Sequence, residues 1–175
     1  VCMLIGFLYT GGPFPIAYSP FGELVSGVVM GMGIVLISFF IQAKTVTFDA
    51  VLISVPSMIL VGAIMLSNNI RDIVGDTEGG RKTLAILVGR GAAVNILAAF
   101  FIVSFAWIVG LIIFNDLTWF ALIVFICVKK PIDAVYLFKA KEQPLEVMPA
   151  MKWTAQTNTF FVFLLAIALG LSLFF

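Results

Sequence analysis

The residues best suited to chemistry lie between 67 and 90, where the chain reads SNNIRDIVGDTEGGRKTLAILVGR. Asn68, Asp72 and Asp76 follow one another at intervals of four residues. On a helix each such step advances about 6 Å and returns to nearly the same face, so we expect an amide oxygen and two carboxylates to point the same way. Two unpaired carboxylates repel each other, and a divalent cation removes that conflict.

Magnesium is the cation that this set of donors predicts. It is a hard ion that binds one or two carboxylates and fills its other positions with phosphate oxygens and water. A Gly-Gly turn at 79–80 follows the acids, and Arg81 and Lys82 come directly after it. Thr83 is expected to cap the next helix, whose exposed N–H groups favour an anion. Carboxylates for a metal, followed by two cations, predict a receptor for a diphosphate headgroup.

A second interpretation of the same segment needs no ligand. Two acids four residues apart usually lie on a solvated helix face, and the two arginines, Arg71 and Arg81, are also placed to form ion pairs. Their partners would then be Asp72, Asp76 or Glu78. The location favours the functional interpretation, because these acids and cations are concentrated in one segment directly after an apolar run.

The composition predicts the elements that hold this segment. Of 175 residues, 62% are hydrophobic and 11% are charged, and the mean hydropathy is +1.19. A soluble domain of this size has roughly a quarter of its residues charged, so most of this surface must face the lipid bilayer. The sequence therefore predicts an all-α, polytopic transmembrane helical bundle. A net charge of +1 argues against nucleic acid as a partner, and the lack of histidine excludes zinc sites or triads that take one from this chain.

Apolar runs of about 20 residues predict the membrane spans. Four runs are long enough, at 24–43, 50–67, 91–115 and 153–175. The run at 117–128 is too short alone, and we expect it to continue past Lys129 and Lys130 to about residue 138, with the lysines snorkelling or lining a polar cavity.

The opening residues, 1–10, are interpreted as the tail of a span whose beginning is missing. The prediction is about five full spans after a partial first one, and residues 1–175 are expected to be the C-terminal part of a longer membrane domain.

Two features inside the spans carry structural expectations. Pro56 cannot donate a backbone hydrogen bond, and we expect neighbouring helices to satisfy the carbonyl that it frees. Gly27 and Gly31 form a GxxxG pair, which allows close helix approach. We expect this pair to serve packing within the chain rather than a dimer face.

The distribution of positive charge predicts the orientation. Successive loops alternate between the two sides of the membrane, with 9–23, 68–90 and 129–152 on one side and 44–49, the turn at 115–116 and the C-terminus on the other. The first side carries nine basic residues: Arg71, Arg81, Lys82, Arg90, Lys129, Lys130, Lys139, Lys141 and Lys152. The second carries Lys44 alone, so the positive-inside rule places segment 68–90 in the cytoplasm.

Two stretches resemble a known family. NNIRDIVGDTEGGRKTLAILVGR (68–90) resembles the second aspartate-rich motif of the UbiA superfamily of intramembrane prenyltransferases. YTGGPFPIAYSPFGELVSG (9–27) is similar to the matching stretch of its 1,4-dihydroxy-2-naphthoate polyprenyltransferases, the membrane enzymes of menaquinone synthesis. The resemblance extends over the whole chain and implies a domain of nine spans with two aspartate-rich loops in the cytoplasm. The first aspartate-rich motif is not found in residues 1–175.

The resemblance implies a reaction and its participants. A polyprenyl diphosphate would donate its prenyl group to 1,4-dihydroxy-2-naphthoate with loss of CO₂, giving demethylmenaquinone, in the inner membrane of a bacterium. Mg²⁺ would be held by Asp72 and Asp76, the catalytic aspartates, with Asn68 as a further ligand. The cations expected at the diphosphate are Arg71, Arg81 and Lys82. The chain alone would be inactive, because it would hold only half of the metal site.

Tyr9, Tyr18 and Glu23 lie on the same predicted side as the aspartates. All three are candidates to contact the aromatic acceptor or a phosphate, and the two tyrosines are the predicted acceptor-binding residues. Interfacial aromatics and a helix-start acid explain the three equally well.

Three alternatives to the whole hypothesis stay open. One is a related prenyltransferase that uses 4-hydroxybenzoate, homogentisate or haem as acceptor, and another is a cation-coupled transporter with Asp72 and Asp76 as its ion site. The third is an inert assembly subunit, which would not need the segment 68–90.

Overall fold

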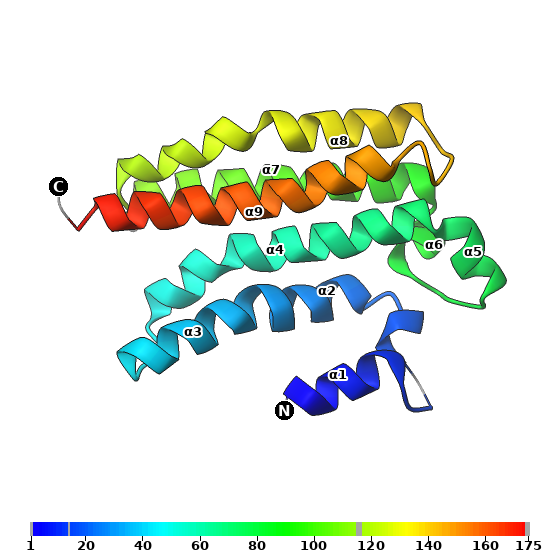
Figure 1. Cartoon of the computed structure of the whole chain (residues 1–175), viewed down its shortest axis with the longest axis horizontal. Helices are drawn as coiled ribbons and strands as arrows, with labels where there is room; N and C mark the ends of the chain where they lie inside the picture. The colour runs from blue at the N-terminus through cyan, green and yellow to red at the C-terminus, as the bar shows by residue number, and fades with distance from the viewer. Residues whose placement is uncertain (1, 14, 115–116, 174–175) are drawn as a thin grey trace.

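The computed structural model describes residues 2–13, 15–114 and 117–173, and every regular element in them is helical. In chain order the elements are α1 (Cys2–Thr10), η1 (Ile16–Tyr18), α2 (Gly22–Ser26), η2 (Gly27–Gly33), α3 (Ile34–Ala43), α4 (Phe48–Arg71), α5 (Ile73–Glu78), α6 (Leu84–Val88), α7 (Arg90–Phe114), η3 (Trp119–Cys127), α8 (Lys129–Ala140) and α9 (Met148–Leu171). The long helices lie side by side along the longest axis of the molecule (Figure 1). The all-α helical bundle predicted from composition is confirmed.

Four helices in the described ranges are long and apolar enough to cross a membrane: Gly22–Ala43, Phe48–Arg71, Arg90–Phe114 and Met148–Leu171. They correspond to the four long predicted spans, and their starts lie within about five residues of the predicted ones. The predicted turn at 115–116 lies outside the described residues. The chain is therefore an integral membrane protein with several membrane-spanning helices.

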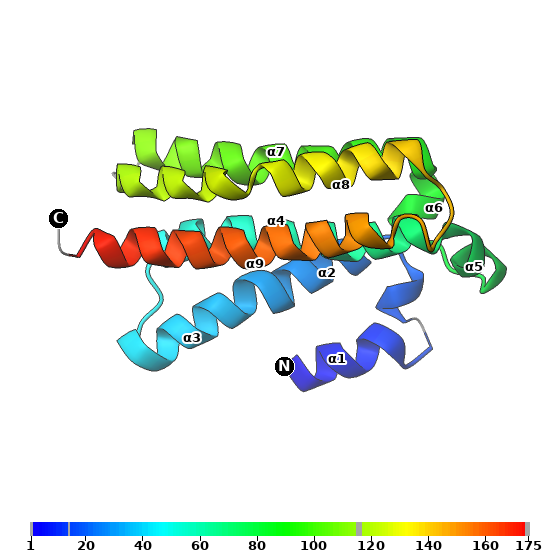
Figure 2. The ribbon, with the colours of Figure 1, turned by 45° about the horizontal axis from the view of Figure 1, so that its top comes forward.

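The remaining predicted span is divided into two pieces. Trp119–Cys127 forms the 3₁₀ helix η3 and Lys129–Ala140 forms α8, and together they extend alongside α7 and α9 (Figure 2). At about 2.0 Å per 3₁₀ residue and 1.5 Å per α residue the two pieces reach about 36 Å, enough to cross a hydrocarbon core of about 30 Å.

Lys129 and Lys130 consequently lie near the middle of this divided span. Lys129 Nζ forms an exposed ion pair with Asp133 at 2.6 Å. Lys130 Nζ donates to Gln156 Oε1 at 2.8 Å and lies 5.1 Å from the ring centre of Phe160. Both lysines thus have polar or aromatic partners on α8 and α9.

Gly27 and Gly31 allow the first full span to contact α4 directly. A Cβ atom on Gly27 would lie 2.4 Å from the carbonyl oxygen of Met58, and one on Gly31 would lie 2.6 Å from the Met58 Cα. These approaches are possible only without a side chain, and a π-helical turn, η2, covers both glycines. The predicted role of this pair in packing within the chain is confirmed.

Pro56 lies inside α4 and is buried. Because proline has no N–H, the carbonyl of Leu52, four residues earlier, loses its helical donor. Trp107 of α7 replaces it, since its indole Nε1 donates to the Leu52 oxygen at 2.9 Å. The prediction that a neighbouring helix satisfies the freed carbonyl is therefore confirmed, and Trp107 is the donor.

One end of the bundle collects the polar connections. In both views η1, α5, α6 and the connection from α8 to α9 lie at this end, opposite the α3–α4 connection that carries Lys44 (Figures 1 and 2). The predicted loops 9–23 and 68–90 therefore lie together in space with the α8–α9 connection, residues 141–147. The third predicted loop, 129–152, was too long, because residues 129–140 form α8 within the bundle.

Candidate functional site

The aspartate segment begins where α4 ends. Asp72 separates α4 from α5 with φ −97° and ψ 9°, so the helix is interrupted at the first predicted carboxylate. The hydrogen bonds nevertheless continue across it, from Asp72 N to the Asn68 oxygen at 3.0 Å and from Asp76 N to the Asp72 oxygen at 2.8 Å. The spacing by one turn that places these three residues near one face therefore survives the interruption.

Both carboxylates have arginine partners. Arg71 binds Asp72 through two hydrogen bonds, Nε to Oδ1 and Nη2 to Oδ2, each 2.6 Å long. Arg81 Nη1 lies 3.0 Å from Asp76 Oδ1. The ion pairs of the ligand-free interpretation are present in this state, and they place two guanidinium groups beside the two acids.

Tyr18 is brought to the same cluster from a distant part of the sequence. The Arg81 guanidinium carbon lies 5.2 Å from the centre of the Tyr18 ring, within the range of a cation–π contact. The backbone N–H of Lys82 donates to the Tyr18 oxygen at 3.0 Å. Asp76, Arg81 and Tyr18 thus form a continuous row, with the exposed Lys82 next to it.

Tyr9 lies elsewhere, between α2 and α4. Its hydroxyl accepts a hydrogen bond from Ser26 Oγ at 3.2 Å and donates to the Met65 sulfur at 3.4 Å. Ser26 and Met65 lie on α2 and α4, and the proposed acceptor role of Tyr9 stays a prediction.

Glu23 and Asn69 form a buried polar contact that the sequence did not predict as a pair. Glu23 is 4% exposed and Asn69 is 8% exposed. Asn69 Nδ2 donates to Glu23 Oε1 at 2.8 Å, which joins α2 to the end of α4. The available signal was an acid and an amide at the ends of two predicted spans, where buried polar groups need partners, but 46 residues separate them.

Arg90 acts as a clamp at the same end of the bundle. Its guanidinium donates to the carbonyl oxygens of Ile70 at 2.9 Å, Phe138 at 3.1 Å and Lys141 at 2.5 Å. These bonds hold the ends of α4 and α8 together beside the aspartate segment. Outside the spans, the hydrogen bond and the charge of Glu146 raise the pKa of Lys141 above its ordinary value.

The donors fit part of a magnesium site. In the part of the chain that the structure describes, no cluster of three or more His, Cys, Asp or Glu side chains is found. Asp72 and Asp76 supply the one or two carboxylates that Mg²⁺ takes when substrate phosphates and water complete its shell. Asn68 is half-buried one turn before Asp72 and makes no side-chain hydrogen bond to another described residue.

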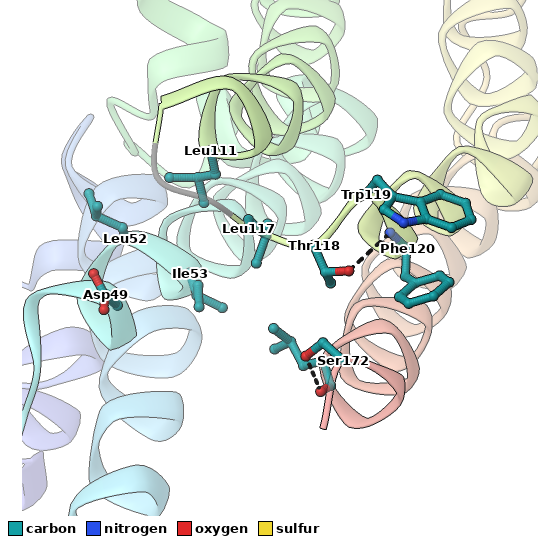
Figure 3. A pocket seen from close by; sticks show the side chains of 10 residues that line it. Asp49, Leu52, Ile53, Leu111, Leu117, Thr118, Trp119, Phe120 and Ser172 are labelled. Atoms are coloured by element: carbon teal, nitrogen blue, oxygen red, sulfur yellow. Dashed lines mark hydrogen bonds between the residues drawn. The ribbon is translucent and has the colours of Figure 1, made fainter. Parts of the chain in front are cut away.

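A cavity of about 780 Å³ lies at the opposite end of the molecule (Figure 3). Its lining includes Asp49 at the start of α4 together with Leu111, Thr118 and Trp119. Along α4, Asp49 is about 35 Å from Asp72 at 1.5 Å per residue. This cavity is therefore separate from the aspartate segment, and the described residues in its lining include one acidic side chain, Asp49.

The spans and the acidic and basic cluster at one end define a polytopic α-helical membrane protein with a polar site at the membrane surface. The chain belongs to the UbiA prenyltransferase family, which matches residues 1–145.

Three relatives illustrate the similarity. The chain is 58% identical over 174 residues to the 1,4-dihydroxy-2-naphthoate octaprenyltransferase of Bacillus subtilis, a match that covers 99% of this chain and 56% of that protein. It is 34% identical over 88 residues to the protein of the same name from Mycobacterium leprae, covering 50% of this chain and 30% of that protein. It is 36% identical over 83 residues to human UbiA prenyltransferase domain-containing protein 1, covering 47% of this chain and 24% of that protein. No solved structure matches significantly.

Proposed function

We propose that the complete protein containing this chain transfers a polyprenyl group from a polyprenyl diphosphate to 1,4-dihydroxy-2-naphthoate, with loss of CO₂, to give demethylmenaquinone. The observation that carries the proposal is the 58% identity, over 99% of this chain, to a Bacillus subtilis protein named for that acceptor. The chain spans just over half of that relative, so the activity is assigned to the complete protein.

The row of Asp76, Arg81 and Tyr18 supports diphosphate binding. Arg81 presents a planar set of donors suited to phosphate oxygens, and stacking on Tyr18 holds its plane in place. Arg71 and Lys82 add two more positive charges nearby. As the allylic C–O bond breaks, these cations stabilise the negative charge that develops on the leaving diphosphate.

Asp72 and Asp76, with Asn68, are the groups that would hold Mg²⁺. When bound, the ion supplies Lewis-acid stabilisation of the same leaving group. Binding of metal to a carboxylate would release its arginine, and that arginine is then available to the diphosphate. The two ion pairs of the ligand-free state thus keep acids and cations in place until substrate arrives.

We further propose that residues 1–175 form the C-terminal part of a UbiA-type domain in the inner membrane of a bacterium, with the aspartate segment in the cytoplasm. Lys129 and Lys130 lie inside the divided span and do not count toward either side. The remaining bias, seven basic residues on one side against Lys44 on the other, supports the orientation. The first aspartate-rich motif of the family, outside this chain, would complete the metal site, so residues 1–175 alone are expected to be inactive.

Membranes containing the complete protein test the proposal. We expect magnesium-dependent transfer from polyprenyl diphosphate to dihydroxynaphthoate, with CO₂ released, and loss of transfer when EDTA removes the metal. Transfer to 4-hydroxybenzoate or homogentisate in preference to the naphthoate would overturn the acceptor. No transfer to any aromatic acceptor, together with cation flux, would favour a transporter.

A further inference from the structure

Glu23 is a buried carboxyl group to which the proposed function assigns no role. Its Oε1 atom is bound to Asn69, but its Oε2 atom is buried and has no hydrogen-bond partner among the described residues. Burying an acceptor without a donor costs free energy, and buried polar atoms in native structures are usually satisfied. The missing donor is therefore to be sought in a molecule that binds beside Glu23.

Glu23 lines a small cavity between the first full span, α4 and α7. The volume is about 230 Å³, and the other lining groups are apolar side chains and glycines, among them Pro20, Met58, Leu84 and Phe100. Pockets for drug-sized ligands measure about 300–1,000 Å³, so this smaller one suits a monocyclic or bicyclic aromatic ring rather than a prenyl chain. One polar acceptor in an apolar cavity fits a hydroxylated aromatic.

The cavity adjoins the proposed diphosphate site. Tyr18 contacts Arg81 and Lys82, and both contacting segments continue into the cavity lining. Pro20 lies two residues after Tyr18, and Leu84 lies two residues after Lys82. Thr83, between Lys82 and Leu84, is 1% exposed, and its hydroxyl oxygen also has no partner among the described residues. A second unsatisfied polar atom therefore lies in the chain segment that separates the cavity from the cations.

We propose that this cavity binds the aromatic acceptor, with a phenolic hydroxyl of the ring donating a hydrogen bond to Glu23 Oε2. The proposal rests on the proposed function and names the part of the site that holds the second substrate. Asn69 positions the carboxylate through Oε1, and it lies three residues before Asp72 in the chain. A site built to accept from a hydroxyl rejects analogues that lack it.

Glu23→Gln in the complete protein is the direct test. Its side-chain oxygen still accepts from Asn69, whereas the NH₂ group that replaces Oε2 cannot accept from a hydroxyl. We expect the KM for the acceptor to rise about 10- to 100-fold, the KM for polyprenyl diphosphate to stay unchanged, and the thermal stability to be nearly retained. An unchanged acceptor KM, or an equal rise in both KM values, would overturn the proposal.

An acceptor analogue supplies an independent measurement in the wild-type protein. Methylating each ring hydroxyl in turn removes its proton, and one ether should bind as weakly to wild type as the parent acceptor binds to Glu23→Gln. Combining that ether with the variant should add little further loss. Full additivity for every ether would mean that no ring hydroxyl contacts Glu23, as expected if the cavity holds only water.

Filling the cavity tests its location without altering Glu23. Leu84→Phe adds bulk to the lining and should weaken acceptor binding, whereas Leu87→Phe on the exposed face of the same helix is the matched control. Equal acceptor binding in both variants would place the ring elsewhere. A wild-type protein that transfers to no acceptor would instead refute the proposed function, so the two failures are distinguishable.

Discussion

At the residue scale, Asp72 and Asp76 are held differently. Asp72 has two short hydrogen bonds to its neighbour Arg71, while Asp76 has a single contact with Arg81 and a side chain that is only 12% exposed. Bidentate charged pairs are the stronger kind. Asp76 therefore exchanges its partner for a metal at lower cost, and Arg81 is the cation most readily released to a diphosphate.

Replacing either aspartate with asparagine should abolish most activity. In Asp72→Asn and Asp76→Asn the carboxylate charge that holds a cation is lost with almost no change of shape. We expect transfer rates to fall by about 100-fold or more, as for loss of one transition-state electrostatic contact, measured in membranes with saturating substrates. Glu78→Gln, on the exposed end of α5, is the control, and wild-type rates in the aspartate variants would remove their proposed roles.

Arg81→Lys separates charge from geometry. Lysine keeps the positive charge but loses the planar fork and the stacking on Tyr18. We predict that the KM for polyprenyl diphosphate rises about tenfold, since one hydrogen bond to a charged group is worth about 1.5–3 kcal/mol. Lys139→Arg on the exposed end of α8 should leave that KM unchanged, and a matching rise there would show that exchanging one basic side chain for another acts nonspecifically.

At the element scale, α4 is the central helix, because it contacts the first full span, α7 and α9. Its sequence predicted a span at 50–67 and the need to compensate Pro56, since these follow from local hydropathy and from the chemistry of proline. The helix itself is longer and runs from Phe48 to Arg71. The sequence did not predict the interruption at Asp72 or the bond from Asn69 to Glu23, because these depend on packing between distant segments. For the same reason the 3₁₀ form of η3 could not be foreseen from a run of apolar residues.

Trp107→Phe should destabilise the bundle because one backbone carbonyl loses its hydrogen-bond donor. The change leaves the Leu52 oxygen without a donor, and we expect thermal unfolding in detergent to show a loss of about 1–2 kcal/mol. In a Pro56→Ala background the restored N–H can bond to Leu52, so the same change should then cost less. Equal losses in both backgrounds would mean that the indole contributes only by packing.

Gly31→Ala should separate the first full span from α4. The added carbon would meet the backbone of Ser57 and Met58 at about 2.6 Å, so the helices must shift. We expect a loss of about 1–3 kcal/mol in thermal unfolding, in the range of overpacked cores. Gly110→Ala on α7, where a Cβ atom has no neighbour within 4 Å among the described residues, should be neutral.

At the scale of the whole molecule, the polar connections lie at the two ends of the bundle, and the basic residues other than Lys129 and Lys130 lie at or near the same two ends. Substituting cysteine at Lys82 and at Lys44, one at a time, allows the orientation to be measured with a thiol reagent that does not cross membranes. We predict that Lys82→Cys reacts only from the cytoplasmic side and Lys44→Cys only from the outside. The reverse pattern would invert the proposed orientation.

The divided span of η3 and α8 has a consequence for the choice of lipid. In 3₁₀ form the nine residues of η3 reach about 4.5 Å further than in α form, which extends the span without adding residues. A thin bilayer would remove the advantage of that extra reach and favour shortening of η3 into an α-helix, whereas a thick bilayer would maintain it. Hydrophobic mismatch therefore affects this segment before the continuous helices. We expect the packing of α8 against α9 to change with the acyl-chain length of the lipids.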